Sequence, residues 1–162
     1  MPEPDLGDFA VAQDGTLYVV TAAAEGERSG CLVGFASQCS IDPPRFVVWL
    51  SVQNHTYSVA RRARHLTVHV LRRDQEALAR LFGGETGDRT DKFAGIAWRP
   101  GREGSPVLAG VAAWFTGRVE AVVAGGDHEG FLLAPVEDAP PEPGPGPLRF
   151  GDARDIEAGH PA

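Results

Sequence analysis

Residues 29–44 read SGCLVGFASQCSIDPP, and this stretch restricts the fold more than any other part of the sequence. Its small and apolar residues follow one another without a helical period, which predicts a closely packed strand and loop. Asp42-Pro43-Pro44 then interrupts regular structure, because proline fixes its own backbone and restricts the residue before it. The apolar run at residues 46–50 follows directly and is typical of a strand buried on both faces.

Further strands are expected on both sides of this stretch. They lie at residues 17–21, 66–71 and 148–150, and within 107–123, as two strands or as one that bends at Gly117. Residues 119–123 and 131–136 predict a hairpin closed by a glycine-rich loop, whereas residues 22–30 predict a turn region.

Only short helices are expected between these strands. One lies within residues 54–64, with Asn54 or Thr56 as its N-cap, and a second runs from a cap at Asp74 to Phe82. One further turn of helix is expected near Lys92. Strands that do not alternate with long helices predict a mainly β fold, an antiparallel barrel with short helical inserts, rather than a doubly wound sheet.

Length and charge limit the class of protein. The 162 residues fit one domain at about 11–150, with a loose segment at 1–10 and a tail at 151–162. The formal net charge of −7 argues against a nucleic-acid binder, which needs a basic surface. No stretch is long and apolar enough to cross a membrane, and the acidic first eight residues do not resemble a secretory signal. We therefore expect a cytoplasmic location.

Two small groups of residues allow more than one interpretation. Cys31 and Cys39 have no metal-ligand spacing, so no metal is expected, and reduced, buried structural thiols are the better hypothesis. Arg61, Arg62 and Arg64 form a basic cluster. It is either a solvated face with acidic partners elsewhere or a local anchor for a phosphate-bearing ligand, which arginine suits geometrically.

The order of the motifs resembles the flavin reductase-like family, an FMN-binding split barrel. In that family a glycine, a small-residue strand and Ser-hydrophobe-Asp-Pro-Pro occur in the order seen at residues 29–44. Residues 51–56 resemble its Ser/Thr-containing phosphate loop, and Phe93 resembles part of its phenylalanine-rich helical insert. Gly126-Asp127-His128 resembles its Gly-Asp-His turn, and residues 147–150 resemble its closing strand. The resemblance covers residues 17 to 150.

The resemblance implies a split β-barrel that forms a homodimer and holds flavin at the dimer interface. Many members transfer a hydride from NADH or NADPH to FMN or FAD and release reduced flavin to a partner oxygenase. Others hold FMN or the deazaflavin F420 for different redox work, and some have no assigned activity. The resemblance therefore implies an NAD(P)H:flavin reductase, with a non-reductase FMN- or F420-binding carrier or redox module as the alternative.

The residues suggest how a flavin could be held. An isoalloxazine ring needs an apolar slot and backbone N–H groups, which small residues allow to approach closely. Its phosphate needs neutral donors and preferably a cation, and a helix start also favours an anion. The expected cofactor-binding residues are Val33, Gly34, Phe35, Ala36, Ser37, Ser40, Asn54, Thr56 and Arg61. Tight strand packing and simple N-capping are the competing explanations.

His128 is the expected catalytic residue. The resemblance places it near the meeting point of nicotinamide and flavin, where it would orient the nicotinamide or support a protonation. Hydride transfer itself needs only correct stacking of donor and acceptor. A solvated loop histidine is the alternative interpretation of His128.

Departures from the family pattern fall where the flavin would be held. The common pattern reads Asn-Gly-Met-Thr where this chain has Ser29-Gly30-Cys31-Leu32, so the threonine hydroxyl is missing. Gly34 and Phe35 stand where small hydroxyl residues are usual. These changes favour the carrier alternative, and they also leave open a structural relative that has lost its ligand.

Overall fold

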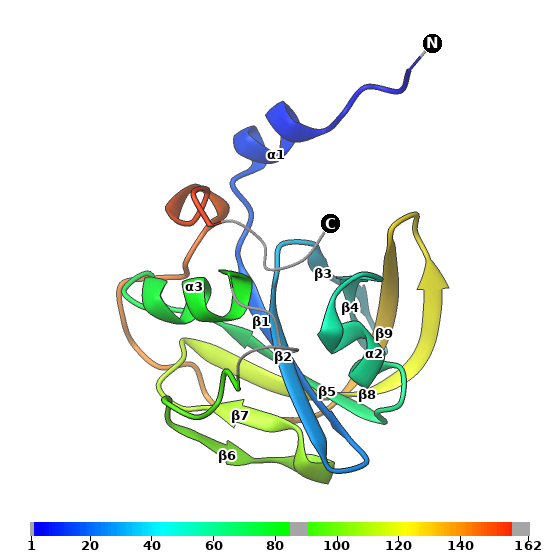
Figure 1. Ribbon diagram of the computed structural model, residues 1–162, viewed down its shortest axis with the longest axis vertical. Helices are drawn as coiled ribbons and strands as arrows, with labels where there is room; N and C mark the ends of the chain where they lie inside the picture. The colour runs from blue at the N-terminus through cyan, green and yellow to red at the C-terminus, as the bar shows by residue number, and fades with distance from the viewer. Residues whose placement is uncertain (1, 85–90, 157–162) are drawn as a thin grey trace.

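Seven strands form one antiparallel sheet in the computed structural model, which describes residues 2–84 and 91–156 (Figure 1). The sheet order is β2-β1-β5-β8-β9-β4-β3. Its strands are β1 (Tyr18–Ala24), β2 (Glu27–Val33), β3 (Ala36–Ile41), β4 (Pro44–Ser51), β5 (His65–Val70), β8 (Ala113–Ala124) and β9 (His128–Asp138). A small second sheet pairs β6 (Trp98–Pro100) with β7 (Pro106–Leu108).

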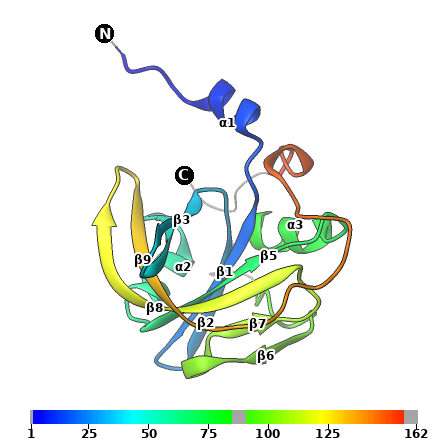
Figure 2. The same cartoon turned by 180° about the vertical axis from the view of Figure 1, so that it is seen from behind.

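The helices are few and short. They are α1 (Gly7–Gln13), α2 (His55–Ala60) and α3 (Glu76–Gly84), with 3-10 turns η1 (Arg102–Gly104) and η2 (Phe150–Asp152). The expected mainly antiparallel β class with short helices is confirmed. Among the described residues no ladder joins the edge strands β2 and β3, so the curved sheet is open along that seam (Figure 2).

Hairpins account for most of the sheet. The β8–β9 hairpin was expected, but it is longer than predicted: it pairs Phe115 with Asp138 and reaches Ala124 and Glu129 at its tip. The expected turn at residues 22–30 was wrong, because β1 and β2 continue through it and pair from Tyr18–Val33 to Ala24–Glu27. Only Glu25 and Gly26 turn the chain, with φ of 54° and 80°, as a tight two-residue hairpin requires.

Strand β4 alternates instead of being buried on both faces. Val48 and Leu50 are buried, while Val47 and Trp49 on the other face are half-buried. Burial along β4 therefore alternates with a period of two. The sequence does not show this alternation, because the residues on the outer face are also hydrophobic. A similar correction applies to the cysteines: Cys31 is buried, but Cys39 is exposed, since β3 is an edge strand.

The predicted helices form with shifted ends. Asn54 caps α2 as expected, its side chain accepting a hydrogen bond of 2.8 Å from the Thr56 N–H. Helix α3 begins at Glu76 rather than after Asp74, whose carboxylate instead pairs with Arg72 at 3.0 Å. Lys92 lies in a hydrogen-bonded turn, not a helix.

The two ends of the chain differ from the expectation. Helix α1 was not expected, and residues 148–150 do not form a strand. Instead, a single bridge pairs Thr16 with Arg149 before η2.

No helix within residues 2–84 and 91–156 has the length and apolar character that a membrane span requires.

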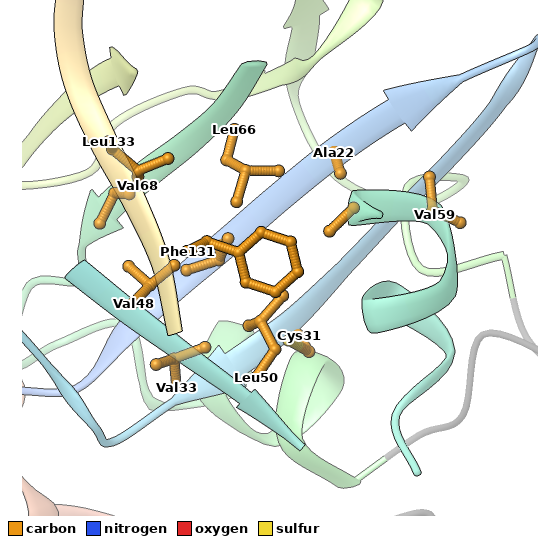
Figure 3. Close-up of a cluster of buried hydrophobic side chains, with 12 residues drawn as sticks. Ala22, Cys31, Val33, Val48, Leu50, Val59, Leu66, Val68, Phe131 and Leu133 are labelled. Atoms are coloured by element: carbon orange, nitrogen blue, oxygen red, sulfur yellow. The ribbon is translucent and has the colours of Figure 1, made fainter. Parts of the chain in front are cut away.

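The sheet curves around one of two apolar cores. Phe131 lies at the centre of the first, surrounded by side chains from β1, β2, β4, β5 and α2 (Figure 3). The second lies between β1, α3, the β6–β7 sheet and residues 148–153, and it contains Phe82 and Phe93 in edge contact at 5.5 Å. Cys31 and Leu50 at the edge of the first core also reach the pocket described below.

His69 connects the large sheet to the small one. Its imidazole is fully buried; Nε2 accepts a hydrogen bond of 3.0 Å from the Leu108 N–H, so Nδ1 carries the proton and donates to the Val19 carbonyl at 2.9 Å. This matches the expectation of a satisfied strand residue. Burial lowers the pKa of His69 to about 4, because a charged imidazolium loses its hydration there.

His69 should make folding sensitive to acid. The unfolded chain binds a proton at this ring near pH 6.5, but the folded chain only near pH 4, so the free energy of unfolding should fall as pH drops through this interval. The loss should be on the order of 3 kcal/mol. Urea unfolding at pH 7 and pH 4.5 measures it, and His69→Gln, which cannot titrate, should show a smaller difference. Equal pH dependence in both proteins would contradict this role.

Candidate functional site

A pocket of about 340 Å³ opens where several elements end. The end of β2, the β2–β3 connection, the end of β4 and the start of β9 form one wall. The start of α2 and the end of α3 form another, and residues of α1, of η2 and of the segment after η2 close the third side. Ends of strands and helices, and the connections between them, converge there. Backbone groups and side chains of different elements therefore reach the same space.

The sheet-side wall is apolar and closely approached by backbone. Val33, Gly34 and Phe35, three of the expected cofactor-binding residues, all line it. Trp49 stands beside them because it lies opposite Gly130, where a Cβ atom would come within 2.8 Å of the indole ring. The absence of a side chain at Gly130 therefore leaves room for the indole, and this residue pair was not predicted from the sequence.

His128, the expected catalytic residue, lines the pocket. It is the first residue of β9 and pairs with Ser51 of β4. Its Nδ1 lies 2.7 Å from a carboxylate oxygen of Asp127, and its ring centroid lies 5.1 Å from that of Phe35. The imidazole thus contacts both a carboxylate and an aromatic ring.

The α2 side of the pocket carries polar groups. Asn54 and His55 line it, and His55 Nε2 lies 2.8 Å from a Glu27 carboxylate oxygen. Thr56 lies behind them, buried, with its hydroxyl 2.8 Å from the Ser29 hydroxyl. Thr56 therefore fixes the start of α2 to β2. Of the two expected cofactor-binding residues Asn54 and Thr56, only Asn54 lines the pocket.

Several expected site residues do not line the pocket. Ala36, Ser37 and Ser40 lie along β3, and the side chain of Ser37 is exposed. Arg61 is exposed beyond α2, with its guanidinium over the Tyr57 ring at 5.7 Å. Its neighbours in the basic cluster face acids: Arg62 contacts Glu25 and Glu27, and Arg64 lies 3.7 Å from Glu103, as the solvated-face interpretation expects.

Two buried residues that line the pocket, Lys92 and Cys31, were not predicted from the sequence as site residues. Lys92 lines it, yet its ammonium group is buried and donates to the carbonyls of Gly30 and Phe82, at 3.0 and 3.1 Å. Burial raises the pKa of the adjacent Cys31 thiol to about 11, so the thiol is neutral at ordinary pH. The contacts of Lys92 and Cys31 join parts of the chain that are distant in the sequence, so no local sequence pattern predicts them.

Both ends of the described chain contribute to the pocket. Ala10 and Gln13 of α1 line it, together with Phe150 and residues 153, 154 and 156. These segments hold one another: the Phe150 N–H donates to the Gly15 carbonyl at 2.8 Å, and the Gly151 N–H donates to the Asp14 carboxylate at 2.7 Å. More than 130 residues separate the hydrogen-bonded partners, so this wall of the pocket could not be predicted from local sequence patterns.

The pocket suits an anion with an apolar ring. Its lining within the described chain includes Lys92, Arg154 and two histidines but no Asp or Glu, although the whole chain carries a net charge of −7. The apolar slot beside Trp49 and Phe35 offers space and ring contacts of the kind that an isoalloxazine needs. The residues present therefore fit a flavin nucleotide.

Comparison with known proteins agrees with this geometry. The model of the "Flavin reductase like domain" matches residues 14–154, which is most of the chain. The chain belongs to the flavin reductase-like family. The family match extends past residue 150, so it includes part of the segment that closes the pocket.

Three related proteins show how far the similarity reaches. A protein named "Probable flavin reductase" from Rhizobium meliloti is 30% identical over 74% of this chain, which spans only 38% of that protein. The reductase component of a 4-nitrophenol 4-monooxygenase/4-nitrocatechol 2-monooxygenase from Rhodococcus opacus is 34% identical, over 82% of this chain and 67% of its own length. An FMN reductase (NADH) from Bradyrhizobium diazoefficiens is 30% identical, over 77% and 69%.

A solved structure has the same fold as this flavin reductase-like chain. An FMN-binding protein from Thermus thermophilus, with bound 1-cyclohex-2-enone, superposes with a TM-score of 0.83 over 100% of this chain and 94% of its own. The sequence identity is 24%, so this likeness establishes the fold alone.

The Trp49–Gly130 contact should be sensitive to one methyl group. In Gly130→Ala the new Cβ would lie 2.8–2.9 Å from three indole carbons, so the ring must move. Overpacking of this kind should lower the free energy of unfolding by about 1–3 kcal/mol and change the tryptophan emission. Urea unfolding followed by fluorescence measures both. Gly95→Ala, whose Cβ would meet open space, is the matched control. Equal behaviour of the two variants would exclude the tight contact.

Proposed function

We propose that this chain is an NAD(P)H:flavin reductase that transfers a hydride to FMN or FAD. The main observation in support is the pocket of this family member. In it an apolar slot with Trp49, Phe35 and His128 lies beside cationic side chains, and no Asp or Glu of the described chain lines it. The relatives support the same activity, since one is named an FMN reductase (NADH) and another the reductase component of a monooxygenase.

The chain's residues would bind and orient the reactants. When bound, a flavin supplies a ring that accepts a hydride from a nicotinamide. Val33, Gly34 and Trp49 would hold that ring in an apolar slot, and Asn54 would offer a polar group beside it. His128, held by Asp127, would orient the nicotinamide or support a protonation. We keep Ala36, Ser37, Ser40, Thr56 and Arg61 as proposed cofactor-binding residues that would need a second subunit or an extended ligand to take part.

Assembly and location follow from the same proposal. Exposed apolar side chains at Ile41, Val122 and Val123, on the β3–β4 and β8–β9 hairpins, support a homodimer. A partner oxygenase would use the reduced flavin, as the names of reductase components among the relatives suggest. We propose further that the curved sheet represents a split barrel, that residues 11–150 form the domain, and that it acts in the cytoplasm.

One observation favours a carrier as the second candidate. Phe35 is 58% exposed, and its ring lies against His128, the residue that would orient the nicotinamide in a reductase. A ring in this position would hinder a second substrate while leaving the flavin slot intact. The chain would then hold FMN or F420 without turning over free flavin.

Titration of the flavin-stripped protein with FMN, FAD and F420, followed by NADH and NADPH, distinguishes these functions. Saturable flavin binding with rapid oxidation of a pyridine nucleotide is the expected result. Binding without oxidation would replace the reductase with the carrier. If none of the three ligands binds, the family fold has been retained without its cofactor, and the proposal is wrong.

His128 is the residue whose change should separate binding from turnover. His128→Ala should raise the KM for NAD(P)H or lower kcat by about tenfold, the size expected from losing one or two good hydrogen bonds. Flavin affinity should change less. His65→Ala provides a control, because His65 contacts Glu103 away from the pocket. Steady-state kinetics with both variants measure the effect, and unchanged parameters in His128→Ala would remove it from the mechanism.

A further inference from the structure

Four side chains with cationic or ionisable nitrogens line the pocket, and three of them already contact protein acceptors. His55 contacts Glu27, His128 contacts Asp127, and the Lys92 ammonium donates to two carbonyls. Arg154 is different. It lines the pocket with an exposed side chain and forms no ion pair with any carboxylate in residues 2–84 or 91–156. Within the described residues, therefore, no carboxylate competes with a ligand for its five donors.

The backbone around Arg154 is well anchored. Ala153 before it is buried in the second core, and Asp155 after it pairs with Arg80 of α3 at 2.8 Å. The turn that leads to it is tied to Asp14 through the Gly151 N–H. The backbone that carries Arg154 is thus fixed at the pocket wall, which reduces the backbone part of the conformational entropy that a ligand contact would cost.

We propose that Arg154 anchors a phosphate group of the nucleotide that enters this pocket. A guanidinium fork matches phosphate geometry, and the lining within the described chain holds no carboxylate to compete with that phosphate. This inference rests on the proposed function and moves the arginine anchor from Arg61, which lies outside the pocket, to a segment that the sequence analysis left outside the domain. The phosphate belongs either to the flavin or to the nicotinamide nucleotide.

Binding assays with and without the phosphate test the proposal. Arg154→Gln should weaken FMN by about tenfold or more and leave riboflavin, which has no phosphate, unchanged. If the nicotinamide nucleotide supplies the phosphate, the same variant should instead weaken NADH or NADPH by a similar factor. Flavin fluorescence and calorimetry measure these affinities directly. Arg154→Lys, which keeps the charge, should retain part of the binding.

Arg102→Gln is the matched control, because Arg102 is also exposed, has no ion pair in the described chain and lies outside the pocket. Thermal unfolding should be unchanged in all three variants. Unaltered affinity of Arg154→Gln for FMN, NADH and NADPH, or an equal loss for FMN and riboflavin, would overturn the inference. If the wild type binds no flavin, the proposed function fails separately, and the NADH and NADPH affinities alone decide the role of Arg154.

Discussion

A seven-stranded sheet with only short helices has to cover its own apolar face, and this constraint governs the architecture. Helix α2 has six residues and cannot shield a face that carries Val20, Val48, Phe131 and Leu133. The strands therefore bend around these side chains, so that β2 and β4 approach the same core from opposite ends of the sheet order (Figure 3). The ends of these strands and their connections then meet above the core, where the pocket lies.

The pocket depends on close backbone approach as much as on side chains. Gly130 gives space to Trp49, and Gly30 lies so close to Phe82 that a Cβ would come within 2.8 Å of its ring. The first contact shapes the sheet-side wall, and the second brings α3 against β2. Lys92 then joins the same two elements by donating to Gly30 and Phe82. A buried cation is tolerable there because carbonyl oxygens compensate its lost hydration.

Local patterns in the sequence predicted most strands and the cap at Asn54, because alternation, β-branching and capping act over a few residues. They failed at residues 22–30, where alanines and charged residues have weak strand propensity and pairing with β5 and β2 decides the outcome. At the site, Val33, Gly34, Phe35, Asn54 and His128 were brought together as the motifs suggested. Trp49, Lys92 and Arg154 could not be identified, since their positions depend on contacts between distant segments.

The hydrogen bonds between residues 14–17 and residues 148–151 also have a consequence for biosynthesis. Leu17 and Gly15, which precede β1, form hydrogen bonds with Leu148 and Phe150, so this part of the chain leaves the ribosome long before its hydrogen-bond partners. All seven strands can be synthesised while this wall of the pocket is still missing. A nascent chain would therefore expose the inner surface of this pocket to water until η2 had closed against Asp14 and α1.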